Sequence, residues 1–396
     1  MNRNNIWNYS FLYSLVLLVP FDLLVSLGMD LYLPAVNEIG TSFKVGREQV
    51  QLTLTMYMAL LGLGQLLLGP LSDKFGRRPI VVIGAVLYSL SSLAIPLSPN
   101  FDYFLGLRLL QSLSASALLV AAFATVRDVF AEREEGVVVY AIMGSVLACV
   151  PAVAPFLGAL IEKQWHWQGI FYFLGIFAAV VAVHTVFKWP ETRPAKTQPF
   201  RFNSLFIILG SKTFIGYTLA YATAMGTFFA YFSTSPSVLM DTLRLSKVEF
   251  SLWFGSVAVV MILTTRFVKP LVGRWGISGT VFRGLAGLFV SGLILYLCEW
   301  LFGVTLLGFM LPMYLIGVNI ALTCAVSANG ALHAFSASAG LATALYYALE
   351  SLYLSLMVSV LIKLIPPGTS ATIAVYILIS SLLAAGFILL GRWQSK

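Results

Sequence analysis

Charged residues are scarce in this sequence. Asp, Glu, Lys and Arg together make up 10% of its 396 residues, whereas soluble domains carry roughly 25%. Apolar residues make up 59%, Phe alone occurs 29 times, and the mean hydropathy is +0.90. A single core cannot hold so many apolar side chains, so a large share of them must face lipid. The composition excludes a water-soluble fold and indicates a membrane protein.

Cysteine and histidine are also rare, with three of each. Cys149, Cys298 and Cys324 lie singly in apolar runs, without the paired spacing or the neighbouring ligands of a metal site. The sequence also lacks a glycine-rich phosphate loop and a nucleophile with an adjacent base. We therefore expect no enzyme activity, no metal and no cofactor. An ion gradient, most simply a proton gradient, is then the expected source of energy.

The net charge of +8 is spread along the chain. Nucleic-acid binding requires a basic face on a soluble module, and no such block occurs. Lys and Arg instead gather in alternate polar segments and near both termini, as the positive-inside rule describes for cytoplasmic loops. We therefore expect both termini in the cytoplasm and no nucleic-acid partner.

Long apolar runs are abundant. A helix needs about 20 apolar residues to cross the hydrocarbon layer. The first run, which begins at Phe11, is too long for a signal peptide, so we interpret it as a retained helix. Twelve such helices are predicted, starting near Phe11, Gln49, Ile80, Asp102, Val137, Gln168, Thr213, Glu249, Thr280, Val304, Gly340 and Ala371.

The longest polar interruption covers residues 189–203 and is rich in proline. It divides the predicted helices six and six. The predicted fold class is therefore all-α integral membrane, with a six-helix bundle in residues 1–188, a cytoplasmic linker in residues 189–212 and a second six-helix bundle in residues 213–396. Transporters made of two such halves bind their substrate between the halves, near the middle of the membrane.

A polar turn follows the second predicted helix and reads Gly-Pro-Leu-Ser-Asp-Lys-Phe-Gly-Arg-Arg-Pro in residues 69–79. Its two glycines suit a tight turn and a close approach of helices, and its aspartate can pair with the arginines to hold one conformation. A generic positive-inside turn would explain the cations but not the spacing of glycine and aspartate. The turn resembles the signature loop of the major facilitator superfamily. The resemblance implies a gating role for Gly69, Asp73, Gly76, Arg77 and Arg78.

The corresponding place after the eighth predicted helix is occupied by residues 266–276. This stretch keeps Lys269, Gly273, Arg274 and Gly276 but contains no aspartate. A lock of the first kind needs an anion opposite the cations. We therefore do not expect the same lock in the second half.

Two further predicted helices carry motifs similar to those of the family. The fourth contains Arg108 and Gln111, with Ser112 where the family usually has glycine. An arginine inside the membrane is a functional candidate by default. The fifth resembles the antiporter motif of drug exporters, with alanine in place of two glycines, and ordinary packing of small residues is the alternative. The gating candidates in these helices are Gln111, Pro151, Pro155 and Gly158.

The end of the first predicted helix, residues 29–34, is similar to bacterial drug exporters of the bicyclomycin and chloramphenicol type. Together with residues 125–128, it most resembles the chloramphenicol and florfenicol exporters. The resemblance implies a proton-coupled antiporter that exports small drug-like molecules across the bacterial inner membrane. Because two six-helix halves enclose their own pathway, a monomer suffices. Export of other drugs such as bicyclomycin, nutrient uptake by a facilitator or proton symporter, and a sensor without transport activity are the alternatives.

Three ionisable residues in the predicted helices are the candidates for proton coupling. Asp22 lies near mid-membrane, whereas Asp30 and Arg108 lie about 5 Å and 9 Å below the outer surface, depths at which they can meet. A low dielectric favours a neutral carboxyl group and a nearby guanidinium favours an ionised one, so small changes load or release a proton. Proton and drug would then compete for the same cavity. A purely structural role is the alternative for all three residues.

The substrate cavity is expected to be mostly apolar and aromatic, with a few polar groups. A position facing lipid or a neighbouring helix is the alternative for each candidate. Glu350, near Tyr346 and Tyr347, is a further intramembrane acid for which functional and structural roles are equally open. The substrate candidates are Met29, Asp30, Ala115, Leu119, Tyr221, Met225, Phe228 and Phe232.

Overall fold

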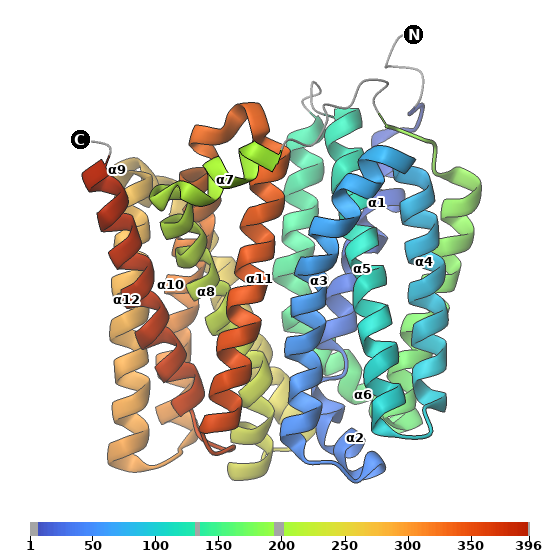
Figure 1. Ribbon diagram of the computed structural model, residues 1–396. Coiled ribbons are helices and arrows are strands. Elements are labelled where there is room, and N and C mark those ends of the chain that lie inside the picture. The colour runs from blue at the N-terminus through green and yellow to red at the C-terminus, as the bar shows by residue number, and fades with distance from the viewer. Residues whose placement is uncertain (1–6, 131–134, 194–201, 395–396) are drawn as a thin grey trace. The chain divides into compact units, whose positions relative to one another are not determined.

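The computed structural model describes residues 7–130, 135–193 and 202–394 (Figure 1). Within these residues the regular secondary structure is helical and includes no strand. The chain forms two compact units, Met1–Phe200 and Arg201–Lys396. Each unit is a bundle of long helices with its own core.

In the first unit, α4 packs against α5 and α6, α5 against α3, and α1 against α5 and α6. The backbone leaves the helical region at Trp165 and His166, which divides α6 into two helices. The Glu38 carboxylate holds this connection, because Oε1 pairs with His166 Nδ1 at 2.8 Å and Oε2 accepts from the Trp167 N–H at 3.1 Å. The helices are α1 (Phe11–Asp30), α2 (Val36–Phe43), α3 (Arg47–Phe75), α4 (Arg77–Ala94), α5 (Phe101–Phe130) and α6 (Glu135–Lys188), with short 3-10 helices at Leu33–Ala35 and Ile95–Leu97.

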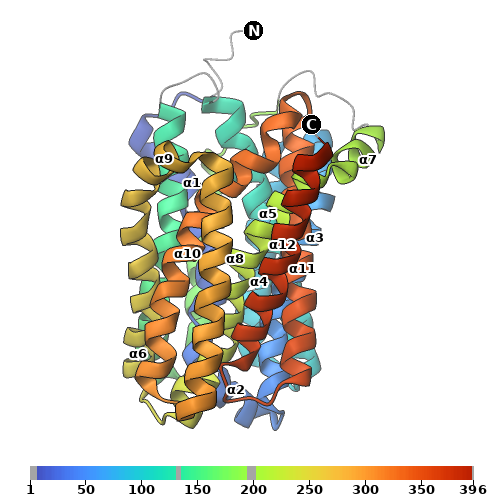
Figure 2. The same ribbon diagram turned by 90° about the vertical axis from the view of Figure 1, so that its left-hand side faces the viewer.

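In the second unit, α8 packs against α10, α11 and α12, and α9 packs against α10 and α12 (Figure 2). Gly276, with a φ of 68°, divides α9 into two helices. The helices are α7 (Phe202–Gly210), α8 (Lys212–Pro236), α9 (Lys247–Phe302), α10 (Leu306–Leu332), α11 (Ala339–Leu364) and α12 (Ala371–Gln394), with a π-helical segment at Ser237–Thr242 and a 3-10 segment at His333–Ser338.

Apolar side chains cover the outside of the long helices as well as their packed faces. On α1, Leu17 and Leu18 are buried, while Leu12 and Val16 are more than half exposed. Helices that are apolar all round are expected in lipid. Among the described residues, nine helices are long and apolar enough to cross a membrane.

Each predicted helix start lies within about one turn of an observed helix start or break. Gln168 follows the break at His166, and Thr280 follows the break at Gly276. The number of membrane crossings and the cytoplasmic position of the termini stay predictions. The sequence does not predict α2 and α7, because a search for runs of about 20 apolar residues passes over such short helices.

Gly76 makes the turn between α3 and α4. Its φ of 110° lies in the region that favours glycine. A Cβ at this position would lie 2.2 Å from Glu191 Oε2, so the glycine also leaves room for a carboxylate. Gly69 lies inside α3, and no described heavy atom lies within 4 Å of the place its Cβ would take. The tight turn and close approach expected of both glycines therefore occur at Gly76 and not at Gly69.

We expect Gly76→Ala to destabilise the protein by about 1 to 3 kcal/mol, because alanine is strained at this φ and its Cβ meets the Glu191 carboxylate. Gly69→Ala is the matched control and should change stability by less than about 0.5 kcal/mol. Thermal unfolding of the two purified variants in detergent, followed by tryptophan fluorescence, measures the difference. Equal melting temperatures would show that Gly76 has no special conformational role.

Candidate functional site

A buried arginine closes the carboxyl end of α1. Because α1 ends at Asp30, the Leu31 N–H is its last helical donor and binds the Leu27 carbonyl oxygen, so the carbonyl groups after Leu27 lack helical N–H partners. Arg108 of α5 supplies one donor, since its Nη1 donates to the Gly28 carbonyl oxygen at 3.0 Å. A cation at this end also complements the helix dipole. Arg108 therefore fixes the end of α1 against α5.

Aromatic rings surround the guanidinium of Arg108. Its Cζ lies 4.5 Å from the ring centre of Tyr32, 4.6 Å from that of Tyr57 and 5.6 Å from that of Phe171. Ring faces attract a cation, most strongly where water is excluded. The Nε and Nη2 atoms of Arg108 are buried and have no hydrogen-bond partner in the described part of the chain. The Nε and Nη2 atoms of Arg108 therefore remain available to donate hydrogen bonds to another group.

Gln111 orients the arginine. Its Oε1 accepts a hydrogen bond from Arg108 Nη1, and its Nε2 donates to Ser92 Oγ at 2.7 Å. Ser92 Oγ in turn donates to the Tyr88 carbonyl oxygen on α4. Ser112, which stands where the family usually has glycine, donates through Oγ to the Tyr57 carbonyl oxygen of α3. These contacts tie α5 to α3 and α4 around the guanidinium.

Gly158 lets α6 reach the backbone at the same end of α1. A Cβ at Gly158 would lie 1.8 Å from the Leu31 carbonyl oxygen, so only glycine fits here without a shift of one helix. Ala154 and Pro155 are buried in the same stretch of α6. The side chain of Pro151 lies outside the described residues. The small residues of this motif therefore serve close helix packing next to Asp30.

Asp22 and Asp30 are both buried on α1, but neither pairs with Arg108. Both carboxylate oxygens of Asp22, and the Ser26 hydroxyl one turn later, lack a hydrogen-bond partner among the described residues. No ion pair joins Asp30 to Arg108 in this part of the chain, so the pairing predicted from depth is wrong for this structure. The guanidinium faces Gly28, and residues 28 and 30 point about 200° apart around the helix.

Arg77 is the centre of an ion-pair network at the start of α4. It is buried, its Nη1 pairs with Asp73 Oδ1 at 2.6 Å, and its Nε pairs with Asp128 Oδ2 of α5 at 2.9 Å. The contact with Asp73 was predicted from the sequence, and the contact with Asp128 was not. The network joins the ends of α3, α4 and α5.

Glu191, just after α6, is a further member that sequence reasoning missed. Its Oε1 accepts from the Arg77 N–H at 2.8 Å and its Oε2 from the Arg78 N–H at 3.2 Å, so it caps the first turn of α4. The Arg78 guanidinium donates to the Val186 carbonyl oxygen and does not pair with Asp73. No local pattern marks such a cap, because its two sides lie far apart in the sequence.

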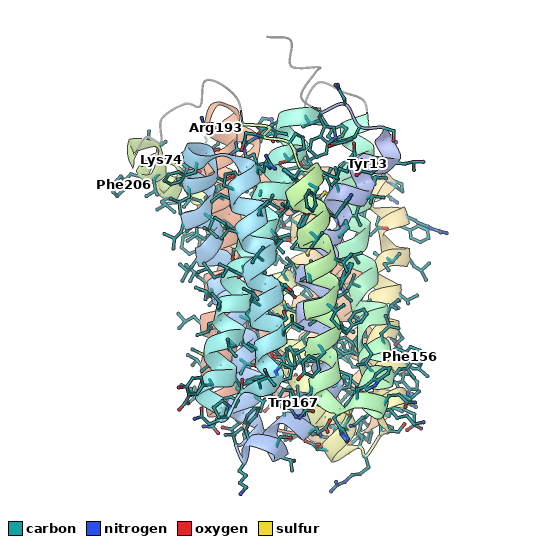
Figure 3. All side chains as sticks on the ribbon, turned by 90° about the vertical axis from the view of Figure 1, so that its right-hand side faces the viewer. Tyr13, Lys74, Phe156, Trp167, Arg193 and Phe206 are labelled. Atoms are coloured by element: carbon teal, nitrogen blue, oxygen red, sulfur yellow. The ribbon has the colours of Figure 1, made fainter. Side chains whose placement is uncertain are left out.

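The network lies at one end of the first unit. Figure 3 shows Lys74 and Arg193 at this end and Trp167 at the other. The Arg193 guanidinium donates to the Lys74 carbonyl oxygen, and the Arg193 N–H donates to Glu191 Oε1 at 2.9 Å. The segment after α6 is therefore bound to the turn between α3 and α4.

Comparison with known sequences identifies the family. Residues 22–358 match the sequence model of the Major Facilitator Superfamily. The chain belongs to this superfamily. It is 40% identical over 391 residues to a chloramphenicol resistance protein of Pseudomonas aeruginosa, covering 99% of this chain and 93% of that protein. It is 31% identical over 281 residues to a bicyclomycin resistance protein homolog of Haemophilus influenzae, covering 70% of each.

Solved structures of transporters share the fold of this chain. A D-xylose-proton symporter matches with a TM-score of 0.70 at 16% identity, covering 96% of this chain and 98% of that chain. A bacterial homolog of the human lysosomal transporter Spinster matches with a TM-score of 0.70 at 14% identity, covering 96% and 94%. The family and these relatives are transporters, so the chain is a multi-pass membrane transporter and not an enzyme.

The substrate candidates predicted from the sequence differ in their surroundings. Met29 and Leu119 are partly exposed, and Ala115 is fully buried in the first unit. On α8 of the second unit, Tyr221 and Met225 are partly exposed. The rings of Phe228 and Phe232 on α8 lie 4.7 Å apart, and the Phe232 ring lies 4.9 Å from that of Phe254. These two α8 rings belong to the core of the unit.

We expect Gly158→Val to abolish transport, because its side chain would overlap the Leu31 carbonyl oxygen and push α6 away from α1. Gly106→Val on α5 is the matched control, since no described heavy atom lies within 4 Å of the Cβ position there. Efflux from intact cells and melting temperature should both be measured. Normal efflux by Gly158→Val would contradict the proposed packing.

We expect Arg77→Ala to lower the free energy of unfolding by about 3 kcal/mol, because the substitution leaves the Asp128 carboxylate buried without its main partner. The double variant Arg77→Ala/Asp128→Ala should recover at least about 1 kcal/mol of this loss. Equilibrium unfolding of the single and double variants tests the coupling. Additive losses would show that the two side chains act independently.

Proposed function

We propose that the chain exports small drug-like molecules, with chloramphenicol and florfenicol as the leading substrates, across the bacterial inner membrane in exchange for protons. The observation that carries this proposal is the 40% identity to a chloramphenicol resistance protein over 99% of the chain. A relative named for bicyclomycin resistance supports drug export as the broader class. Export needs no enzymatic step and no cofactor, because the proton gradient supplies the energy.

The proposed topology has twelve crossings in two six-helix bundles, residues 1–188 and 213–396, joined by the linker 189–212. Both termini lie in the cytoplasm, as the distribution of Lys and Arg indicates. A transporter with two such bundles encloses its own pathway, so a monomer suffices. In this proposal the candidates on α1, α5 and α8 bind the drug.

Asp22 is the first candidate for the proton. An ionised Asp22 would be a buried charge without a compensating hydrogen bond, which is costly. The observed arrangement therefore accommodates the protonated acid. Asp22, Ser26 and Asp30 follow one another at intervals of four residues and so form a polar stripe along α1. We assign proton binding to this stripe.

Arg108 supplies the means of release. Its unpartnered Nε and Nη2 can donate hydrogen bonds to a new anionic partner after a shift of the guanidinium. A guanidinium that moves next to Asp30 favours the ionised carboxylate and so expels the proton. A drug that binds next to Asp30 and displaces its proton also leaves the carboxylate ionised. Gln111 holds the guanidinium on Gly28 until such a shift occurs.

The network of Asp73, Arg77 and Asp128 provides the gate. The ion pairs of the buried Arg77 with Asp73 and Asp128 hold the ends of three helices together in one arrangement. Opening the unit at this end requires these pairs to separate, which makes the alternative arrangement less stable. In this proposal Gly76 and Gly158 allow the tight packing that the closed arrangement needs.

We expect Asp30→Asn and Asp22→Asn each to abolish export, because an amide cannot release a proton. Chloramphenicol accumulation in a pump-deficient bacterium, with and without a protonophore, measures this directly. Asp102→Asn, an exposed position in the first turn of α5, is the control and should export like wild type. Protonophore-sensitive export by either Asn variant would remove that aspartate from the switch. High accumulation in wild-type cells would reject phenicols and point to other drugs or to nutrient uptake.

A further inference from the structure

Glu350 is an acid of the second unit that the proposed mechanism does not use. It lies on α11, its side chain is 4% exposed, and it accepts a hydrogen bond from Ser351 Oγ at 3.0 Å. No Lys, Arg or His in the described ranges forms an ion pair with it. Ionisable residues inside a membrane protein are costly and usually paired, so an acid without a cation indicates a missing partner.

Three tyrosines lie within electrostatic range of this acid. Tyr346 and Tyr347 precede Glu350 by four and three residues, so all three side chains lie on one side of α11. The rings of Tyr346 and Tyr347 lie 5.2 Å apart, and Tyr221 of α8 lies 5.0 Å from the first and 5.9 Å from the second. The three rings therefore form a compact cluster contributed by two helices.

One of these rings has an unused polar group. Tyr346 is fully buried, and its hydroxyl has no hydrogen-bond partner among the described residues. Tyr347, by contrast, is 37% exposed and leaves the cluster accessible. A buried hydroxyl beside a buried carboxyl group is expected to have a partner. Among the described residues, the Glu350 carboxyl group thus lacks a cationic partner and the Tyr346 hydroxyl lacks a hydrogen-bond partner.

The other titratable groups that face Glu350 carry no positive charge. Cys324 of α10 and Tyr376 of α12 lie within electrostatic range of it. Tyr376 already donates its hydroxyl hydrogen to the Ala222 carbonyl oxygen at 2.7 Å. Among the described residues, the titratable groups within electrostatic range of Glu350 are four tyrosine phenols and the Cys324 thiol, and none of them carries a positive charge.

We infer that Glu350, Tyr221, Tyr346 and Tyr347 form a binding site for the positively charged head of an organic cation. The carboxylate supplies the opposite charge, and the ring faces supply the attraction that aromatic cages use to bind quaternary ammonium groups. The inference rests on the proposed export function and extends it to a second substrate class. Neutral phenicols would not need this site, whereas cationic drugs would.

Charge balance couples this site to protons. Without a ligand the buried Glu350 is accommodated as the neutral acid, because an unpaired buried charge is costly. When an organic cation binds, the O–H bond of the carboxyl group breaks, the proton passes to water, and the carboxylate pairs with the cation. One bound cation therefore releases one proton, so no net charge is added to the site.

The test uses the purified full-length protein and benzyltrimethylammonium as the probe, with binding measured by calorimetry in a weakly buffered solution. We expect wild type to bind the probe and to release about one proton per cation. Glu350→Gln should bind it at least tenfold more weakly and release none. Glu249→Gln is the matched control, because this exposed acid caps α9 and glutamine also serves in a capping box.

Several results would overturn the inference. Wild type that fails to bind the probe, or Glu350→Gln that binds it as tightly as wild type, would do so. Equal weakening of chloramphenicol binding by Glu350→Gln would show that Glu350 has only a structural role. If Glu350→Gln does not fold, the partly exposed Tyr347→Leu replaces it and should weaken probe binding at least threefold. A wild type that binds the probe but exports no chloramphenicol would instead refute the proposed phenicol export.

Discussion

The guanidinium of Arg108 is the constraint around which the first unit is organised. A permanent cation deep among apolar helices must find its partners inside the protein. Five helices supply them, with a carbonyl group from α1, rings from α3 and α6, the Gln111 amide from α5 and a serine of α4 behind that amide. The close contact of Gly158 with Leu31 depends on the same geometry, because it sets the position of the α1 end.

Much of the fold is predictable from the sequence because lipid imposes a simple rule. Runs of about 20 apolar residues become long helices, and polar breaks become their ends. The site is only partly predictable. Counting residues gives depth but not rotation about the helix axis, which explains why Asp30 and Arg108 share a depth without facing each other. The cap of α4 by Glu191 joins residues 114 positions apart, and only tertiary packing reveals it.

The two units place their buried charges in opposite ways. The first holds a cation among aromatic rings, and the second holds the acid Glu350 among aromatic rings. Their polar turns also differ. In the first unit Arg77 binds Asp73 and Glu191, whereas in the second unit Arg266, Lys269 and Arg274 are exposed and form no ion pair with described residues. The absence of an aspartate from residues 266–276 explains this difference. The two bundles thus differ in the electrostatics of their buried groups and of their polar turns.

The contact of Glu191 with the start of α4 has a consequence for the connection between the units. Through Glu191 and Arg193, the chain is anchored three to five residues after the end of α6. Tension applied to the chain beyond Arg193 is borne by this anchor before it reaches α6. The linker can therefore change in length, or be cut, without unravelling the first bundle, and a first half produced separately would retain this anchored end.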